Sequence, residues 1–200
     1  MDDTHPLRER TCVIIKPDGV KLGATGEILH RFEKAGLKIV ALKMVQPTPE
    51  HMDKHYQESP EWLEGLGEKT YATFDQFGWN VGEVMGTTDK TEIGKMVKKW
   101  LVEYFTEAPV VATVLEGMHA VTTVRKLVGN TIPIKAEPGT IRGDFSTDSN
   151  SAANMEKRAV RNVIHASGNI EEANFEIEHW FSPEEIHEYT RASESAMFRA

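Results

Sequence analysis

The chain of 200 residues contains one cysteine, Cys12, and no long apolar run. A single cysteine cannot form an intramolecular disulfide, and it excludes zinc sites built from several cysteines. No apolar segment reaches the roughly 18 residues that a membrane-spanning helix needs. The polar start MDDTHPLRER also lacks the apolar stretch of a signal peptide. We therefore expect a cytoplasmic protein that makes no membrane contact.

The two most familiar nucleotide-binding motifs are missing as well. Gly19, Gly23 and Gly26 have neither the G-x-x-x-x-G-K-[ST] spacing nor the G-x-G-x-x-G spacing. These absences argue against a Walker-type or a Rossmann-type nucleotide site. The sequence has no internal repeat and no low-complexity tract, and its length suits one domain spanning residues 1–200.

Acidic residues outnumber basic residues by 31 to 23, which gives a formal net charge of −8 at pH 7. This charge argues against a protein whose main task is to coat nucleic acid or an anionic membrane. The excess is uneven: residues 57–118 carry 11 acidic and 5 basic groups, whereas residues 119–165 carry 4 acidic and 7 basic groups. An acidic protein with one basic stretch can still bind a small anion there.

The pattern of apolar residues predicts alternating strands and helices. Strands are expected at residues 11–16, 37–45, 109–117 and 161–167, and helices at 28–35, 49–56, 97–105, 119–127 and after Asn169. Residues 129–144 are expected to form a long loop. This order predicts an α+β domain with a ferredoxin-like, four-stranded antiparallel sheet that carries helices. Two segments, at about 57–96 and about 146–157, have the character of insertions.

His165 is the strongest candidate for a reactive side chain. It lies at the end of an apolar strand and just before a helix, where one ring nitrogen can face a cleft while a partner holds the other. Glu176, two turns into the next helix, is a suitable partner. A neutral, oriented imidazole is a good nucleophile near neutral pH. Taken alone, His165 also fits a strand-end histidine bonded to the backbone.

Several residues could bind an anion near this histidine. Arg142 lies in the glycine-flanked segment 139–144, and Lys16 ends the first strand beside a Pro-Asp-Gly turn. Arg125 and Thr131 lie in the basic stretch. Each of these residues, taken singly, also fits a structural role. His51 and His55 share one face of a helix but lack a third metal ligand, so we expect them to face solvent.

Three separated motifs together carry a resemblance to a known family. They are Ile15-Lys16-Pro17-Asp18-Gly19-Val20, the segment GTIRGDF at 139–145 and the segment RNVIHAS at 161–167, followed by WFSPEE at 180–185. In this order and setting the chain resembles nucleoside diphosphate kinases over roughly residues 8–56 and 97–190.

The resemblance implies an enzyme that moves the γ-phosphoryl group from a nucleoside triphosphate to a nucleoside diphosphate. It implies a ping-pong mechanism through a phosphohistidine, with Mg²⁺ bound to the nucleotide phosphates, and assembly as a homo-oligomer. The resemblance assigns catalytic roles to His165, Glu176, Lys16 and Tyr56, with Ser167 supporting Glu176. It assigns nucleotide contacts to Lys16, Arg125, Thr131, Arg142 and Asn162.

The sequence departs from the family pattern in the segment after Tyr56. Residues 57–96 are much longer than the usual link, and we expect them to form either a lid beside the cleft or an oligomer contact. The aromatic residue that stacks on the base is replaced, and Trp62, Trp79 and Trp100 are all candidates. Gly168 stands where the family often has an acidic residue. This puts a metal–water contact there in doubt.

Two other functions remain open from the sequence. A catalytically silent relative could serve as an interaction protein, although the joint presence of His165, Glu176, Lys16 and Arg142 argues against it. Ferredoxin-like sheets also form RNA-recognition domains. The net charge and the lack of aromatic-rich sheet motifs oppose that alternative, so no nucleic-acid partner is expected.

Overall fold

The computed structural model describes residues 6–56, 58–192 and 194. Four antiparallel strands form one sheet in the order β2-β3-β1-β4, which confirms the predicted fold class. The strands are β1 (Arg8–Ile15), β2 (Lys38–Val45), β3 (Val110–Met118) and β4 (Ile164–Ala166). The two inner strands, β1 and β3, form the longest pairing, and the short strand β4 lies at one edge.

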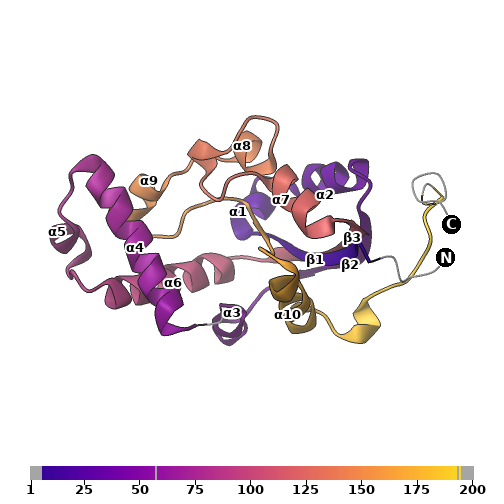
Figure 1. Ribbon diagram of the computed structural model, residues 1–200, viewed down its shortest axis with the longest axis horizontal. Coiled ribbons are helices and arrows are strands. Elements are labelled where there is room, and N and C mark those ends of the chain that lie inside the picture. Colours follow the sequence, from indigo (N-terminus) through magenta and orange to yellow (C-terminus); the bar gives the residue numbers. More distant parts are fainter. Residues whose placement is uncertain (1–5, 57, 193, 195–200) are drawn as a thin grey trace.

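Helices cover both faces of the sheet (Figure 1). Helices α1 (Pro17–Lys21), α2 (Thr25–Lys34), α7 (Ala120–Val128) and α8 (Ile141–Phe145) lie on one side, and α3 (Pro49–His55), α6 (Lys90–Thr106) and α10 (Ile170–Trp180) on the other. Alternation along β1 produces the two cores. Val13 and Ile15 pack under α2 and α7, whereas Cys12 and Ile14 pack against α3, α6 and α10.

Most of the predicted elements are confirmed, and their caps explain where they begin. The side chains of Thr48 and Asn169 accept hydrogen bonds from the first turns of α3 and α10. The main errors concern three segments. The helix expected at 97–105 begins at Lys90, the strand expected at 161–167 spans only β4, and the loop expected at 129–144 contains the 3₁₀ turn η1 (Pro133–Lys135) and α8.

Between α3 and β3 the chain forms a helical arm, consisting of α4 (Pro60–Phe77), α5 (Val81–Met85) and the first half of α6. In Figure 1 this arm extends to the left, away from the sheet. The arm has its own small core around Phe74, Ile93 and Trp79. It contacts α9 (Asn150–Met155), which lies in the second segment that the sequence predicts to be an insertion.

Two glycines bring α4 and α6 into close contact. A Cβ atom on Gly94 would lie 2.0 Å from the carbonyl oxygen of Leu63, and one on Gly67 would lie 2.2 Å from that of Lys90. Because backbone atoms occupy these positions, neither glycine can carry a side chain unless the helices move apart.

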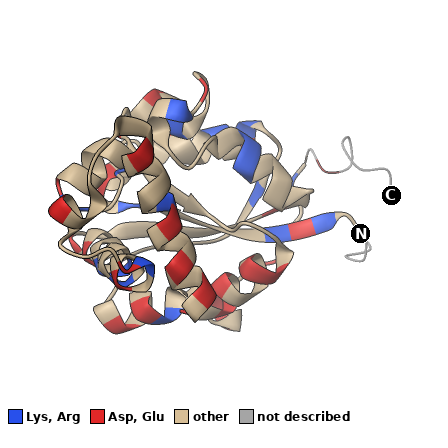
Figure 2. Ribbon diagram, turned by 60° about the vertical axis from the view of Figure 1, so that its left-hand side comes forward, with Lys and Arg blue, Asp and Glu red and all other residues tan. Residues whose placement is uncertain are grey.

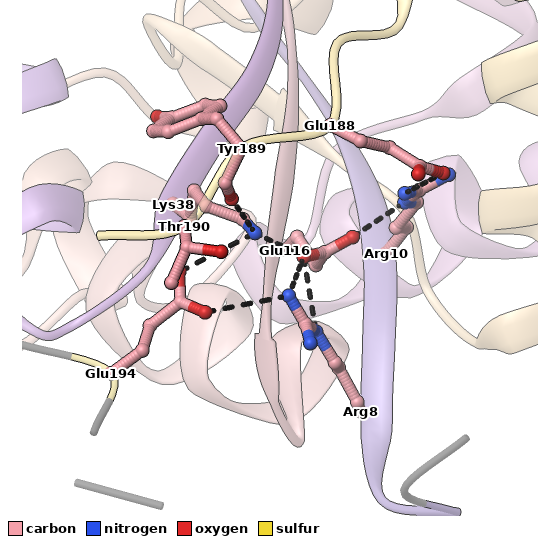
Figure 3. Close-up of a pocket in the computed structure, with 8 residues that line it drawn as sticks. All are labelled: Arg8, Arg10, Lys38, Glu116, Glu188, Tyr189, Thr190 and Glu194. Atoms are coloured by element: carbon pink, nitrogen blue, oxygen red, sulfur yellow. Dashed lines mark hydrogen bonds and ion pairs between the residues drawn. The ribbon is translucent and has the colours of Figure 1, made fainter. Parts of the chain in front are cut away.

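At the other end of the molecule, an ionic cluster fastens the C-terminal segment to the sheet (Figure 3). Glu116 of β3 is the centre of this cluster: Arg10 Nε lies 2.7 Å from its Oε2 and Lys38 Nζ lies 2.8 Å from its Oε1. Arg8 also pairs with Glu116, and Glu194 pairs with Lys38. The segment that follows the 3₁₀ turn η2 (Pro183–Glu185) runs beside the edge strand β2. There the Tyr189 hydroxyl donates to the Ile39 carbonyl at 2.8 Å.

These cations hold the pKa of Glu116 at about 2, against the desolvation that burial imposes on the carboxyl group. A carboxyl group whose pKa is lowered in the folded state stabilises the fold at pH values above its pKa in the unfolded chain, about 4.3. That contribution is lost as the pH falls from there through about 2.

A pair of glycine substitutions tests the packing of the arm. We expect Gly94→Ala to lower the free energy of unfolding by about 1–3 kcal/mol, because α4 must shift away from α6. Gly65→Ala is the matched control in α4, since a Cβ there meets nothing within 4 Å. It should raise stability by up to about 1 kcal/mol through helix propensity. Urea unfolding of both variants measures the difference, and a Gly94→Ala protein as stable as the parent would contradict this packing.

Neutralising the centre of the ionic cluster should also lower stability. We expect Glu116→Gln to cost about 1–3 kcal/mol at pH 7, because three cations lose the carboxylate between them. The cost should shrink as the pH is lowered from 4.5 towards 2, where the parent protein loses the same charge. Glu188→Gln, at the exposed rim beside Arg10, is the control and should change stability little. Equal effects of the two variants would show that Glu116 is not the central group.

Candidate active site

A cleft of about 220 Å³ lies at the sheet edge formed by β4, beneath α7 and α8. It contains nearly all of the residues predicted from the sequence. Seven of the eight line it, namely Lys16, Tyr56, Arg125, Thr131, Arg142, Asn162 and His165, together with Leu101, Val128, Gly129 and Ala166. The eighth residue, Glu176, is buried behind His165.

His165 and Glu176 form a hydrogen-bonded pair. Nε2 of His165 lies 2.7 Å from Oε1 of Glu176, and the hydroxyl of Ser167 donates to Oε2 of the same carboxylate at 2.6 Å. A carboxylate only accepts, so the imidazole proton is on Nε2 and Nδ1 carries a lone pair. Within the described residues Nδ1 has no hydrogen-bond partner, and the ring is 22% exposed at the cleft. The pair therefore offers an oriented nucleophilic nitrogen.

A strained residue positions the strand that carries His165. Val163 has a φ of 57°, an unusual backbone conformation for a β-branched residue. The turn after β1 holds both of its backbone groups: Lys16 N donates to Val163 O at 2.9 Å, and Val163 N donates to Asp18 Oδ2 at 3.0 Å. Gly19 is needed there, since a Cβ would lie 2.7 Å from the Val163 carbonyl oxygen.

The roles of Asp18, Gly19 and Val163 were missed from the sequence. In the sequence the Pro-Asp-Gly segment is a turn after a strand and part of a family motif, and neither feature assigns a role to Asp18 or Gly19. Its contact with a residue 145 positions later is a tertiary feature that has no local signal.

Lys16 and Asn162 form a second polar pair in the cleft. Nζ of Lys16 donates to Oδ1 of Asn162 at 2.8 Å, and Nδ2 of Asn162 donates to the Thr131 carbonyl at 2.9 Å. The ammonium also lies 4.9 Å from the ring centre of Phe105. Burial, with the charge of Arg142 acting in the same direction, lowers the pKa of Lys16 to about 7. An incoming anion would raise that pKa again.

Arg142 is placed differently from the sequence-based interpretation. It lies on α8 rather than in an open loop, and it is buried. Its guanidinium donates to the Ile164 carbonyl at 2.7 Å and to the Gly129 carbonyl at 3.0 Å, so part of its hydrogen-bonding capacity holds the cleft together. Burial and the nearby charge of Arg125 lower its pKa to about 10, and the group remains charged at neutral pH. Arg125 itself is exposed on α7.

The prediction that His51 and His55 face solvent was wrong. His55 is buried beside His165, and the ring of His51 stacks on that of His179 at a centroid distance of 3.9 Å. His179 and Trp180 of α10 pack against these two residues, so that His55 is buried and His51 is half-buried. Periodicity within α3 shows that the two residues share a face, but it does not reveal that α10 covers that face.

Of the three candidate tryptophans, Trp62 adjoins the cleft. Its ring stacks on Tyr56 at 5.9 Å, and Tyr56 lines the cleft. Trp79 packs against Phe74 and Phe77 in the core of the arm. Trp100 lines a separate cavity between α6 and Arg161.

Comparison with known proteins agrees with this geometry. The sequence model of nucleoside diphosphate kinase matches residues 9–62 and 88–186. The chain is 49% identical over 178 residues to a nucleoside diphosphate kinase of Pyrobaculum aerophilum, covering 89% of this chain and 97% of that one. It is 42% identical over 186 residues to the enzyme of the same name from Pyrococcus furiosus, covering 93% of this chain and 91% of that one. The chain belongs to the nucleoside diphosphate kinase family.

Solved structures of family members have the same fold. A crystal structure of the Pyrobaculum aerophilum enzyme superposes with a TM-score of 0.88 at 48% identity, covering 90% of this chain and 100% of that one. A structure of the Borrelia burgdorferi nucleoside diphosphate kinase is a transition-state mimic with bound vanadate and ADP. It superposes with a TM-score of 0.76 at 35% identity, covering 96% of this chain and 98% of that one.

The family match has one gap, at residues 63–87, which corresponds to most of α4 and all of α5. Near the histidine lies Gly168, where the resemblance led us to expect an acidic residue. The carboxylate of Glu172 lies beside it and accepts a hydrogen bond from Gly168 N at 2.7 Å. A negative charge is therefore still present next to this backbone position.

The distribution of charge leaves a local positive site at the cleft. Figure 2 shows Asp and Glu along most of the helices, in keeping with the net charge of −8. The lining of the cleft nevertheless contains Lys16, Arg125 and Arg142 and, among the residues that the structure describes, no carboxylate. A concave site lined by one sign of charge concentrates its field on an incoming anion.

Nucleotide binding should be coupled to proton uptake at Lys16. With a pKa of about 7 in the free protein, Lys16 is largely neutral at pH 8, and bound phosphates should make it charged. We expect the binding of ADP at pH 8 to be accompanied by the uptake of close to one proton per site from solvent. The affinity of the protein for ADP should fall as the pH rises above 7. Isothermal titration calorimetry in buffers of different ionisation enthalpy measures the uptake.

Lys16→Arg is the control for this experiment, because arginine keeps the cation but does not titrate in this range. Proton uptake should disappear in that variant. Undiminished uptake would assign the proton to another group.

Proposed function

We propose that this protein is a nucleoside diphosphate kinase in which His165 carries the phosphoryl group between two nucleotides. One observation carries the proposal: the bond from Nε2 of His165 to Glu176 leaves Nδ1 as the lone-pair nitrogen at a cationic cleft. An imidazole fixed in one tautomer by a carboxylate is suited to nucleophilic catalysis.

The reaction proceeds in two transfers. In the first, Nδ1 forms a bond to the γ-phosphorus of the nucleoside triphosphate while the bond from that phosphorus to its bridging oxygen breaks. The nucleoside diphosphate leaves with the electron pair. In the second, a terminal β-phosphate oxygen of another nucleoside diphosphate attacks the phosphohistidine, and Nδ1 recovers its lone pair. Because one site serves both nucleotides in turn, the kinetics are ping-pong.

The residues around His165 have roles suited to phosphoryl transfer, where catalysis is mainly positioning and charge stabilisation. The two guanidiniums of Arg125 and Arg142 and the hydroxyl of Thr131 bind the phosphates. Lys16 contacts phosphate and, together with Asn162, the sugar hydroxyls. Tyr56 lines the site beside the histidine.

Mg²⁺ would reach this site with the nucleotide. The cleft lining offers cations and neutral donors rather than the carboxylate oxygens that Mg²⁺ prefers, so the nucleotide phosphates would supply most of its ligands. When bound, the ion supplies charge neutralisation on the phosphates. The chain's own groups then orient the phosphate and the imidazole.

The match to the nucleoside diphosphate kinase family supports further proposals. We infer one nucleoside diphosphate kinase-like domain over residues 1–200, with inserted segments at about 57–96 and 146–157, assembled as a homo-oligomer in the cytoplasm. Among the described residues no helix is both long and apolar enough to span a membrane. Only the start of the arm, at Trp62, adjoins the cleft, so the arm fits a wall of the nucleotide site better than a lid over it.

Phosphorylation of the protein distinguishes an active enzyme from a silent relative. Incubation with γ-labelled ATP should place acid-labile, alkali-stable phosphate on the protein, and His165→Ala should abolish it, because Nδ1 is the acceptor. His30→Ala, at an exposed position of α2, is the control and should retain the label. Transfer of the label to added GDP completes the reaction. A protein that takes up no such phosphate would contradict the proposal.

A further inference from the structure

The buried imidazole of His55 lies directly behind the His165–Glu176 pair. Its side chain is 1% exposed, and its ring meets that of His165 edge-on at a centroid distance of 4.9 Å. Phe105 and Trp180 enclose the remaining sides. A polar ring enclosed in this way needs a hydrogen-bond partner, and the identity of that partner fixes its tautomer.

Trp180 is that partner. The indole Nε1–H can only donate, and it donates to Nδ1 of His55 at 3.2 Å. Nδ1 is therefore an acceptor, and the proton of the neutral ring is on Nε2. The ring stays neutral because burial lowers the pKa of His55 well below its usual value, and the nearby His165, His179, Lys16 and His51 act in the same direction.

The N–H group of His55 faces the carboxylate that orients His165. Nε2 of His55 lies 3.9 Å from Oε1 of Glu176, the oxygen that accepts from Nε2 of His165 at 2.7 Å. A distance of 3.9 Å exceeds a hydrogen bond, and the interaction is the attraction between an N–H dipole and a charge in a buried site. Ser167 holds the other oxygen. The carboxylate is thus approached by donors on both of its oxygens.

The same three side chains have the composition of a metal site, since one ligand atom from each of His55, His165 and Glu176 lies within 4.8 Å of the others. Their hydrogen-bonding roles oppose this alternative. A metal needs a lone pair on each ligating nitrogen, whereas Trp180 keeps a proton on Nε2 of His55 and Glu176 keeps one on Nε2 of His165. A metal on Nε2 of His165 would also move that proton to Nδ1, the nitrogen that must attack.

We propose that His55 is a positioning residue for phosphoryl transfer. Its Nε2–H, directed by Trp180, holds the Glu176 carboxylate in place. Glu176 in turn keeps the proton of His165 on Nε2 and its lone pair on Nδ1. This inference rests on the proposed role of His165 as the phosphoryl carrier. It adds two residues of α3 and α10, His55 and Trp180, to the set that determines the reactivity of the histidine.

Substitutions of His55 distinguish the role of its Nε2–H donor from the packing role of its ring. We expect His55→Phe, which keeps an aromatic ring, to slow phosphoenzyme formation about 10-fold or more, a loss of the size seen when the partners of metal-ligating histidines are removed. The dissociation constant for ADP should stay within about twofold, because His55 does not line the cleft.

His55→Gln and His55→Asn form a matched pair for the same measurement. The amide nitrogen of glutamine reaches the position of Nε2, whereas that of asparagine reaches only the position of Nδ1. His55→Gln should therefore recover most of the lost rate, and His55→Asn should not. This comparison remains informative if the phenylalanine variant fails to fold.

Nitrogen-15 NMR of the histidine rings gives a readout that packing alone would not change. In the parent protein we expect His165 and His55 both to carry the proton on Nε2. Trp180→Phe should convert His55 to a mixture of tautomers, and His55→Phe should raise the Nδ1–H fraction of His165. His30→Phe, at an exposed position of α2, is the control and should leave the rate and both tautomers unchanged.

The outcomes separate this inference from the proposed function. Loss of label in His165→Ala together with an unchanged rate in His55→Phe would overturn the role of His55 alone. Equal losses in the glutamine and asparagine variants, with the His165 tautomer unaltered, would assign His55 a packing role and also overturn it. Retention of the label in His165→Ala would instead overturn the assignment of the carrier.

Discussion

The contact between the turn after β1 and Val163 is the constraint on which the active site depends. The strand that carries His165 has only three residues, and its pairing with β1 cannot by itself fix the direction of the chain before it. Bonds from Lys16 N to Val163 O and from Val163 N to Asp18 hold that chain in a left-handed conformation. Backbone strain of this kind persists only where the surroundings enforce it. Lys16 and His165 consequently enter the same cleft.

In the rest of the site, buried side chains orient the side chains that are exposed in the cleft. His165 is partly exposed, but Glu176, Ser167 and His55 behind it are buried. Arg142 donates hydrogen bonds to the carbonyl oxygens of Ile164 and Gly129. These bonds connect α8 to β4 and to the end of α7. A preorganised set of donors needs little rearrangement when a charged phosphate arrives, and this is the main source of catalysis in such sites.

Much of the fold and the cleft could be predicted from the sequence, because both depend on local patterns or on motifs that stand in a fixed order. Seven of the eight predicted site residues line one cleft, and the eighth, Glu176, supports the histidine. The errors have two causes. The buried state of His55 depends on neighbours distant in the chain. The helices α6 and α8 instead begin at local caps, Asp89 and Thr140, that the sequence analysis overlooked. Helical periodicity identifies a face but not what covers it.

The sequence by itself determined the alternation of strands and helices, the caps that start α3 and α10, and which residue types surround a nucleophilic histidine. Those features follow from spacing, turn chemistry and motif order within short segments. The tertiary structure decided the tautomer of His165, the burial of His55 against Trp180, and the close packing of the arm through Gly67 and Gly94. A single cysteine and a net negative charge limited the chemistry available. Only the fold could gather Lys16, Arg125 and Arg142 into one positive cleft, because their separation along the chain is bridged by packing alone.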